Sequence, residues 1–229
     1  MIVLGLDASS DAAAASIVSD GVLLCEHTLN NGKNHSVKLL SMIENMLDET
    51  GISFCDIDVY ACGVGPGSFT GVRIGAATAK GFAQSWNKPM TAVSSLEALA
   101  QNLRSYQGLR VAAIHARVDE LFCAAYDAFD NPVIEPCVMT VDELLNQLKG
   151  KACMVVGNGA LMNKESFIRE LGKDAVPEST CLHVLRGAAI AEVGYKQIVN
   201  GKLCSYEQLA PVYLRVSQAE REYNEKHNR

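Results

Sequence analysis

The sequence has no long hydrophobic run. Its apolar start, MIVLGL, stops at Asp7 and lacks both the basic residues and the length of a secretory signal peptide. No stretch approaches the ~20 apolar residues that a membrane-spanning helix requires. We therefore expect a cytoplasmic protein with no membrane partner.

Paired cysteines are also missing. The chain has eight cysteines, and none belongs to a C-x-x-C pair. Most are flanked by apolar residues, as expected of small buried thiols. We therefore interpret them as reduced core residues and expect neither a disulfide framework nor a zinc site. The eight are Cys25, Cys55, Cys62, Cys123, Cys137, Cys153, Cys181 and Cys204.

Aromatic residues and positive charge are both scarce. Aromatic residues make up 6% of the chain, and its formal net charge is −6. Few aromatics among many aliphatic residues favour helices packed on a sheet over a β-sandwich. A protein that binds nucleic acid alone is usually basic, so a role in RNA chemistry would require a more basic partner. The hydrophobic content of 48% suffices for one large domain or two lobes.

The order of apolar segments predicts two similar α/β units. Asp20-Gly21 is a hairpin signal, and it lies in a meander of three strands at 2–6, 12–18 and 22–28. The first unit continues with a helix at 34–50, a strand at 59–64, a helix at 70–85, a strand at 89–93 and a helix that begins at the capping box Ser94–Glu97. The second has strands at 110–115, 121–126, 133–138 and 152–156, and helices at 140–149, 163–171 and 183–199.

In both units a strand meander is followed by a helix, a strand and at least one more helix. We assign residues 1–106 to an N-terminal lobe and 107–229 to a C-terminal lobe, with the last helices packing back on the N-terminal lobe. Two lobes around a cleft, each a mixed sheet with helices on its faces, are typical of the actin-like ATPase (ribonuclease H-like) fold.

The most distinctive segment is GPGSFTGVRIG at Gly65–Gly75. It follows a predicted buried strand and opens a helix, so its amides could hold an anion. The established phosphate motifs do not fit. Ala79 stands immediately before Lys80, where a Walker A motif needs its second glycine, and the glycines at 65, 67 and 71 miss the G-x-G-x-x-G spacing by one residue. A nucleophile elbow G-x-S-x-G is absent too.

Small residues continue along the predicted helix. Gly71, Gly75 and Ala79 recur every four residues, and each glycine inside a helix costs about 0.8–1 kcal/mol relative to alanine. A close approach of another backbone would compensate for this cost. That backbone belongs either to this protein's own sheet or to another chain that binds the helices at 34–50 and 70–85.

Nearly the whole chain resembles the bacterial TsaB (YeaZ) family, most densely over residues 58–100 and least over 129–209. One departure is His115-Ala116-Arg117, where the family usually has Asp-Ala-Arg, so the resemblance does not carry a role of that aspartate in the cleft over to His115. The matching segments are GPGSFTGVRIG, Asp7-Ala8-Ser9, Asn34-His35-Ser36, residues 93–100, Ala116-Arg117, Gly157-Asn158-Gly159 and residues 211–215.

The resemblance implies a non-catalytic scaffold or activator of tRNA threonylcarbamoyladenosine (t6A) synthesis. In that family the protein pairs with the catalytic subunit TsaD and the ATPase TsaE, meets tRNA through the complex, and forms a homodimer when alone. The interface that this implies comprises His35, Leu39, Ile43, Met46, Ser68, Phe69, Thr70, Val72, Arg73, Gly75, Ala76 and Ala79.

The resemblance also bears on cofactors. The catalytic relative carries His-x-x-x-His on its first helix, whereas here Leu39 stands four residues after His35, so we expect no metal site. Asp7 and the turn Gly157-Asn158-Gly159 stand where an actin-like fold places phosphate and adenosine contacts. They form either a vestigial nucleotide cleft, with ATP and Mg²⁺ bound by the partners, or the working site of a small ATPase or kinase.

Overall fold

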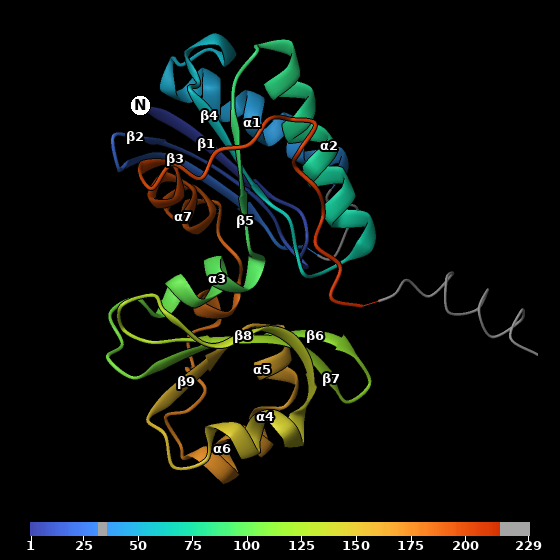
Figure 1. Ribbon diagram of the computed structural model, residues 1–229, viewed down its shortest axis with the longest axis vertical. Coiled ribbons are helices and arrows are strands. Elements are labelled where there is room, and N and C mark those ends of the chain that lie inside the picture. Colours follow the sequence, from blue (N-terminus) through green and yellow to red (C-terminus); the bar gives the residue numbers. More distant parts are fainter. Residues whose placement is uncertain (32–35, 216–229) are drawn as a thin grey trace, which may run out of the picture.

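The computed structural model describes residues 1–31 and 36–215. His35 and the polar tail from residue 216 onward lie outside the described residues. The chain forms two sheets with helices on their faces, and a short helix lies between them (Figure 1).

The first sheet has the strand order β3-β2-β1-β4-β5. Strands β1 to β3 form the antiparallel meander expected from the sequence, and β4 and β5 run parallel to β1. Asp20 and Gly21 both have positive φ angles at the first hairpin, as a tight turn requires. The bounds are β1 Ile2–Asp7, β2 Ala13–Ser19, β3 Val22–Leu29, β4 Val59–Gly63 and β5 Met90–Val93.

Helices cover both faces of this sheet. α1 (Ser36–Thr50) and α2 (Phe69–Ser85) pack on one face, and α7 (Gly187–Val199) packs on the other. Side chains alternate along a strand, and β1 shows this directly: Leu4 belongs to the cluster under α1 and α2, whereas Val3 belongs to the cluster beside α7. Although α7 comes late in the sequence, it completes the first lobe.

The second sheet has the order β8-β7-β6-β9, with β9 parallel to β6 and the other pairs antiparallel. The strands are β6 Leu109–Arg117, β7 Glu120–Tyr126, β8 Pro132–Thr140 and β9 Cys153–Val156. The helices α4 (Val141–Leu148) and α6 (Lys164–Leu171) lie beyond this sheet, away from the first lobe (Figure 1), and α5 (Asn158–Met162) packs on β6 and β9. Thr140 and Glu143 form a capping box at the start of α4.

One predicted helix is shorter than expected. The sequence predicts a helix over 183–199, but α7 begins at Gly187 and a 3-10 turn occupies Thr180–His183. The ring of His183 is buried, with one nitrogen 2.9 Å from the carbonyl oxygen of Pro177 and the other 3.2 Å from the amide of Gly157. These contacts hold His183 in the turn rather than in the helix.

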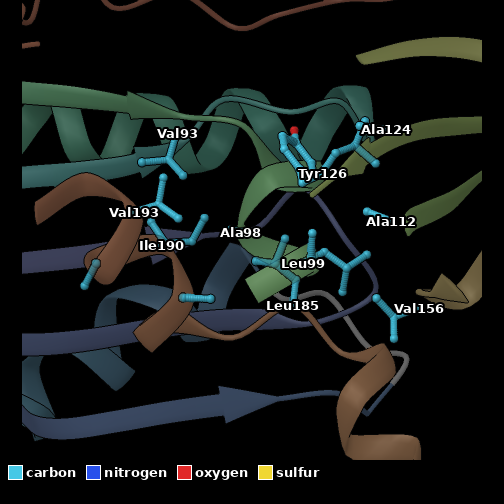
Figure 2. Close-up of a cluster of buried hydrophobic side chains, with 14 of the residues drawn as sticks. Val93, Ala98, Leu99, Ala112, Ala124, Tyr126, Val156, Leu185, Ile190 and Val193 are labelled. Carbon is cyan, nitrogen blue, oxygen red and sulfur yellow. The ribbon is translucent and has the colours of Figure 1, made fainter. Parts of the chain in front are cut away.

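The two lobes share one hydrophobic core. α3 (Ser95–Ala100) lies between the sheets, and Leu99 on it belongs to the same cluster as Val193 of α7 and Val156 of β9 (Figure 2). Asp130 of the second lobe accepts from Arg110 of β6 at 2.6 Å and, across this junction, from Lys196 of α7 at 2.7 Å. The lobes are therefore packed as one body.

The C-terminal segment returns to the first lobe. Cys204 bridges to Met90 of β5, Leu209 is buried, and the amide of Val212 donates to the carbonyl oxygen of Val64 at 2.8 Å. Arg215 then pairs with Glu120 of the second sheet at 3.1 Å. None of the helices within the described ranges is long and apolar enough to cross a bilayer.

Candidate functional site

The segment Gly65–Gly75 is hydrogen-bonded to the loop that follows β1. The amide of Ser68 donates to the carbonyl oxygen of Ser9 at 2.7 Å. The Ser68 hydroxyl caps α2 by accepting from the amide of Gly71 at 3.2 Å, and the amide of Val72 donates to the Ser68 carbonyl oxygen. These three amides already have acceptors within the protein, so they are not available to a phosphate.

Three glycines are required by close backbone and side-chain packing. A Cβ atom at Gly71 would lie 1.9 Å from the carbonyl oxygen of Ala8, and one at Gly67 would lie 2.2 Å from that of Ser9. A Cβ atom at Gly63 would lie 1.9 Å from Oδ2 of Asp7. No side chain larger than hydrogen fits at such distances, so these glycines serve the contact between β4, α2 and residues 7–9.

The small-residue stripe on α2 faces the sheet, which corrects part of the predicted interface. Gly75 and Ala76 are buried, and Gly75 lies over Ala8 and Leu6. A side chain without exposed surface cannot contact a partner, so the packing interpretation of the stripe is the right one. The predicted interface residues placed in the core are Leu39, Ile43, Met46, Val72, Gly75, Ala76 and Ala79.

Four of the predicted interface residues do reach the surface at the start of α2. Ser68, Thr70 and Arg73 are exposed, and Phe69 is half-buried. Phe69 stacks on Tyr213 with ring centroids 4.5 Å apart, and Nε of Arg73 donates to the Tyr213 hydroxyl at 2.9 Å. For these four residues a role in binding a partner stays a prediction.

The outer faces of α1 and α2 enclose an open groove, which we call the outer groove. Its volume is about 480 Å³, and two of its large apolar side chains, Leu40 and Trp86, are 46% and 43% exposed. Sequence analysis missed these residues because it followed the apolar stripe that includes Leu39. The outer groove is lined by Leu40, Phe54, Ala77, Thr78, Gly81, Phe82, Ser85 and Trp86.

One signal for the outer groove is present in the sequence, and a second comes from the structure. Trp86 is the single tryptophan of the chain, and tryptophan is enriched at the centres of protein interfaces. Gly81 lies inside a helix although a Cβ atom there would meet nothing within 4 Å. Unlike Gly71, it is not required by packing within the protein.

Asp7 ends β1 as expected, but its carboxylate is fully buried. It accepts from the Ser9 amide at 2.8 Å and from the Ser9 hydroxyl at 2.9 and 3.0 Å, and the Ser95 hydroxyl donates at 3.3 Å. Burial raises the pKa of Asp7 to about 6, although these hydrogen bonds act in the opposite direction. In this geometry the carboxylate serves the junction between β1 and α3 and does not face solvent.

The turn Gly157-Asn158-Gly159 also packs closely and makes hydrogen bonds within the protein. A Cβ atom at Gly157 would lie 2.2 Å from the carbonyl oxygen of Ala113, and one at Gly159 would lie 2.9 Å from it. Asn158 accepts from the amide of His115 at 2.8 Å and donates to Asp11 at 2.8 Å. It therefore links the second sheet to the loop between β1 and β2.

A cavity of about 210 Å³ lies between the lobes beside this turn. Asp11, Asn158 and His183 are among its lining residues, whereas Asp7 is not. The structure therefore brings the turn to the inter-lobe cavity but leaves Asp7 in the core, so the two halves of the predicted nucleotide site do not converge.

Three comparisons with known proteins agree with one another. The family model described as TsaD, tRNA N6-adenosine threonylcarbamoyltransferase, matches residues 23–194. The tRNA threonylcarbamoyladenosine biosynthesis protein TsaB of Escherichia coli is 32% identical, over 94% of this chain and 95% of the relative. TsaB of Bacillus subtilis is 28% identical, over 98% of this chain and 99% of the relative.

A solved structure has the same architecture. YeaZ from Pseudomonas aeruginosa superposes with a TM-score of 0.80 and 26% identity, over 93% of this chain and 99% of that one. The likeness spans both sheets and confirms the two-lobed actin-like ATPase fold predicted from the sequence.

Proposed function

This chain belongs to the TsaB family and takes part in the biosynthesis of threonylcarbamoyladenosine on tRNA, and from this premise we propose that it acts there as a non-catalytic scaffold. In this proposal it pairs with the catalytic subunit TsaD and with the ATPase TsaE in the cytoplasm. It meets tRNA through the complex, which suits a chain whose formal net charge is −6.

The observation that carries the proposal is the outer groove. It lies between two helices whose inner faces pack in the core, and it is lined by the exposed side chains of Leu40 and Trp86 and by the small residues Ala77 and Gly81. Large apolar side chains beside small ones let a second helical surface approach closely and bury area. We propose that TsaD occupies this groove, and that a second copy of the chain occupies it when TsaD is absent.

The polar groups of the predicted nucleotide site already have partners within the protein, which supports a scaffold rather than an enzyme. The Asp7 carboxylate is enclosed by Ser9 and Ser95, and Asn158 already bonds Asp11 and the amide of His115. A magnesium ion or a phosphate would have to displace these partners. We propose that ATP and Mg²⁺ act on the partner proteins instead.

A substitution in the groove tests the pairing. Gly75 and Ala76 are unsuitable positions, because they are buried and a bulky residue there would disturb the core. Gly81→Arg adds a long charged side chain on an exposed position with open space. We expect the affinity for purified TsaD, measured by calorimetry, to fall at least ~10-fold and the homodimer to dissociate in sedimentation experiments.

The matched control is Asn146→Arg, which adds the same charge on the exposed side of α4 in the second lobe. This variant should bind TsaD as the parent protein does. Undiminished affinity of Gly81→Arg would remove the outer groove from the interface. Reconstituted tRNA modification with TsaD and TsaE should require this chain and should be lost with Gly81→Arg.

The inter-lobe cavity favours one alternative, a small ATPase or kinase with its own nucleotide site. Its volume of about 210 Å³ and its polar residues Asp11 and Asn158 could receive part of a nucleotide. Calorimetry of the isolated chain with ATP and Mg²⁺ separates the two proposals. Tight binding, with turnover that Asp11→Ala in the cavity wall abolishes, would establish the enzyme and overturn the scaffold.

A further inference from the structure

The edge strand β3 and the last turn of α1 bring together three side chains of metal-binding type: Cys25, His27 and Glu49. Each offers one ligand atom, and these atoms all lie within 4.8 Å of one another. Over residues 1–31 and 36–215, no other group of this kind is found. The cluster lies away from the inter-lobe cavity and from the residues that line the outer groove.

The strand alternation places this cluster under α1. Cys25 and His27 are two residues apart on β3, so they face the same side of the sheet. Glu26, which lies between them, faces the other side, where its carboxylate accepts from the amide of Ala188 at the start of α7 at 2.9 Å. Because α1 and α7 cover opposite faces of this sheet, the Cys25 and His27 side chains meet Glu49 of α1.

The distances fit a metal ion. Glu49 Oε2 accepts from Cys25 Sγ at 3.3 Å and lies 3.0 Å from His27 Nε2. A tetrahedral zinc ion with its usual bond lengths holds its sulfur, nitrogen and oxygen ligands about 3.4–3.6 Å apart. The two distances from Glu49 are a few tenths of an ångström shorter than this, and the Cys25 and His27 ligand atoms lie within 4.8 Å of each other. Rotation of these side chains would bring the three atoms to the spacing of a coordination sphere.

We propose that Cys25, His27 and Glu49 form a zinc-binding site. Thiolate and imidazole ligands select zinc over magnesium and calcium, which prefer oxygen. Three protein ligands leave one tetrahedral position for water. The His27 side chain is 27% exposed and that of Glu49 is 56% exposed, so the ion has a path from solvent.

Zinc binding requires a particular protonation state of Cys25 and of His27. The Cys25 thiol releases its proton to solvent, and the imidazole of His27 carries its proton on Nδ1 so that the Nε2 lone pair faces the ion. The bound ion would join the end of α1 to the edge strand of the sheet. This role is structural and does not depend on the proposed function.

Sequence analysis excluded a metal site because it searched for short ligand spacings. Cys25 and His27 are two residues apart, but Glu49 lies at the far end of the following helix. Only the packing of α1 on β3 brings the third ligand to the other two.

Cobalt spectroscopy on the full chain tests the site. The protein is stripped with a chelator, desalted and titrated with Co²⁺, and zinc affinity is then measured by competition. We expect one equivalent of Co²⁺ to give a thiolate-to-cobalt charge-transfer band and the visible bands of tetrahedral cobalt. Cys25→Ser should abolish the charge-transfer band. His27→Gln and Glu49→Gln should weaken binding at least ~10-fold, since even loss of an outer hydrogen-bond partner typically costs 10–100-fold.

Two control variants are available in the same chain. Cys181→Ser removes an exposed thiol elsewhere, and Glu44→Gln removes an exposed carboxylate from the same helix. Both should bind as the parent protein does. At the same zinc concentration, zinc should also raise the melting temperature of the parent protein by more than that of Glu49→Gln. The absence of a charge-transfer band in the parent protein, or its persistence in Cys25→Ser, would overturn the proposal.

Discussion

The two sides of α2 differ in their exposure to solvent, and the sequence pattern predicts the opposite of what the structure shows. On its inner side, Gly71 and the buried Ala79 pack on residues 6–9 and the sheet. On its outer side, Trp86 and Leu40 of the neighbouring helix stand at the rim of an open groove. The small, regularly spaced residues that suggest an interface are buried against the sheet. The side of α2 that faces the large apolar residues is exposed to solvent.

This difference separates two uses of small residues. Where a backbone lies opposite, as Ala8 lies opposite Gly71, glycine is required by distance and serves the fold. Where nothing lies opposite, as at Gly81, glycine costs helix stability without a gain within the monomer. The second kind is the better indicator of a surface that another chain covers.

The largest expected effect comes from filling the inner side. In Gly71→Val the new Cβ would lie 1.9 Å from the carbonyl oxygen of Ala8, so α2 must move away from β1. We expect the free energy of unfolding, measured by urea titration, to fall by about 3 kcal/mol or more, or the chain not to fold. Gly71→Ala provides a milder version, and an unchanged urea midpoint in it would contradict the close packing.

The buried Asp7 gives the inner side a pH dependence. Because its pKa is raised to about 6 in the folded state from an ordinary value of 3.8, the folded protein binds this proton more tightly than the unfolded chain. The contribution of the neutral carboxyl to stability is complete below about pH 4 and is lost as pH rises to about 6. The loss amounts to roughly 3 kcal/mol.

Urea unfolding of the parent protein and of Asp7→Asn at several pH values isolates this contribution. The difference between their unfolding free energies should change between about pH 4 and 6 and stay constant above that range. Asp130 supplies a control, because its pKa shift has the opposite sign to that of Asp7. Burial favours its neutral form, but hydrogen bonds from Lys196, Gln101 and Arg110 lower its pKa overall. A difference between the parent and Asp7→Asn that is independent of pH would mean that Asp7 is not desolvated.

On the outer side, Trp86→Ala should affect binding more than folding. The indole is 43% exposed, so its loss should change the free energy of unfolding by less than about 1 kcal/mol. A buried tryptophan at an interface is typically worth 2 kcal/mol or more, which corresponds to roughly 30-fold weaker binding. Calorimetry with TsaD and urea unfolding measure the two effects, and a variant that loses stability but keeps its affinity would reverse the assignment.

The smallest expected effect comes from Gly81→Ala. The added methyl group meets nothing within 4 Å, and alanine is favoured over glycine inside a helix by about 0.8–1 kcal/mol. The melting temperature of the monomer should therefore rise by a few degrees. A decrease would show that the outer side of α2 is not free in the monomer.

Much of the fold could be predicted from the sequence. The Asp20-Gly21 turn, the strand meander and the helices at α1, α2 and α4 all follow from local patterns, and the motif at Gly65–Gly75 led to the right family. The start of α7 was missed because buried contacts of His183 hold it in a turn. The outer groove and the Cys25–His27–Glu49 cluster were missed because each combines residues from separate elements.

The sequence by itself determined the order of the elements, the alternation of buried and exposed residues and the membership of the TsaB family. Only the tertiary structure decided which side of α2 meets the sheet, because helical periodicity fixes the angles between side chains but not the direction that they face. The burial of Asp7 was decided in the same way. Its solvation depends on Ser95 and Gly63, which are distant in sequence and adjacent only after folding.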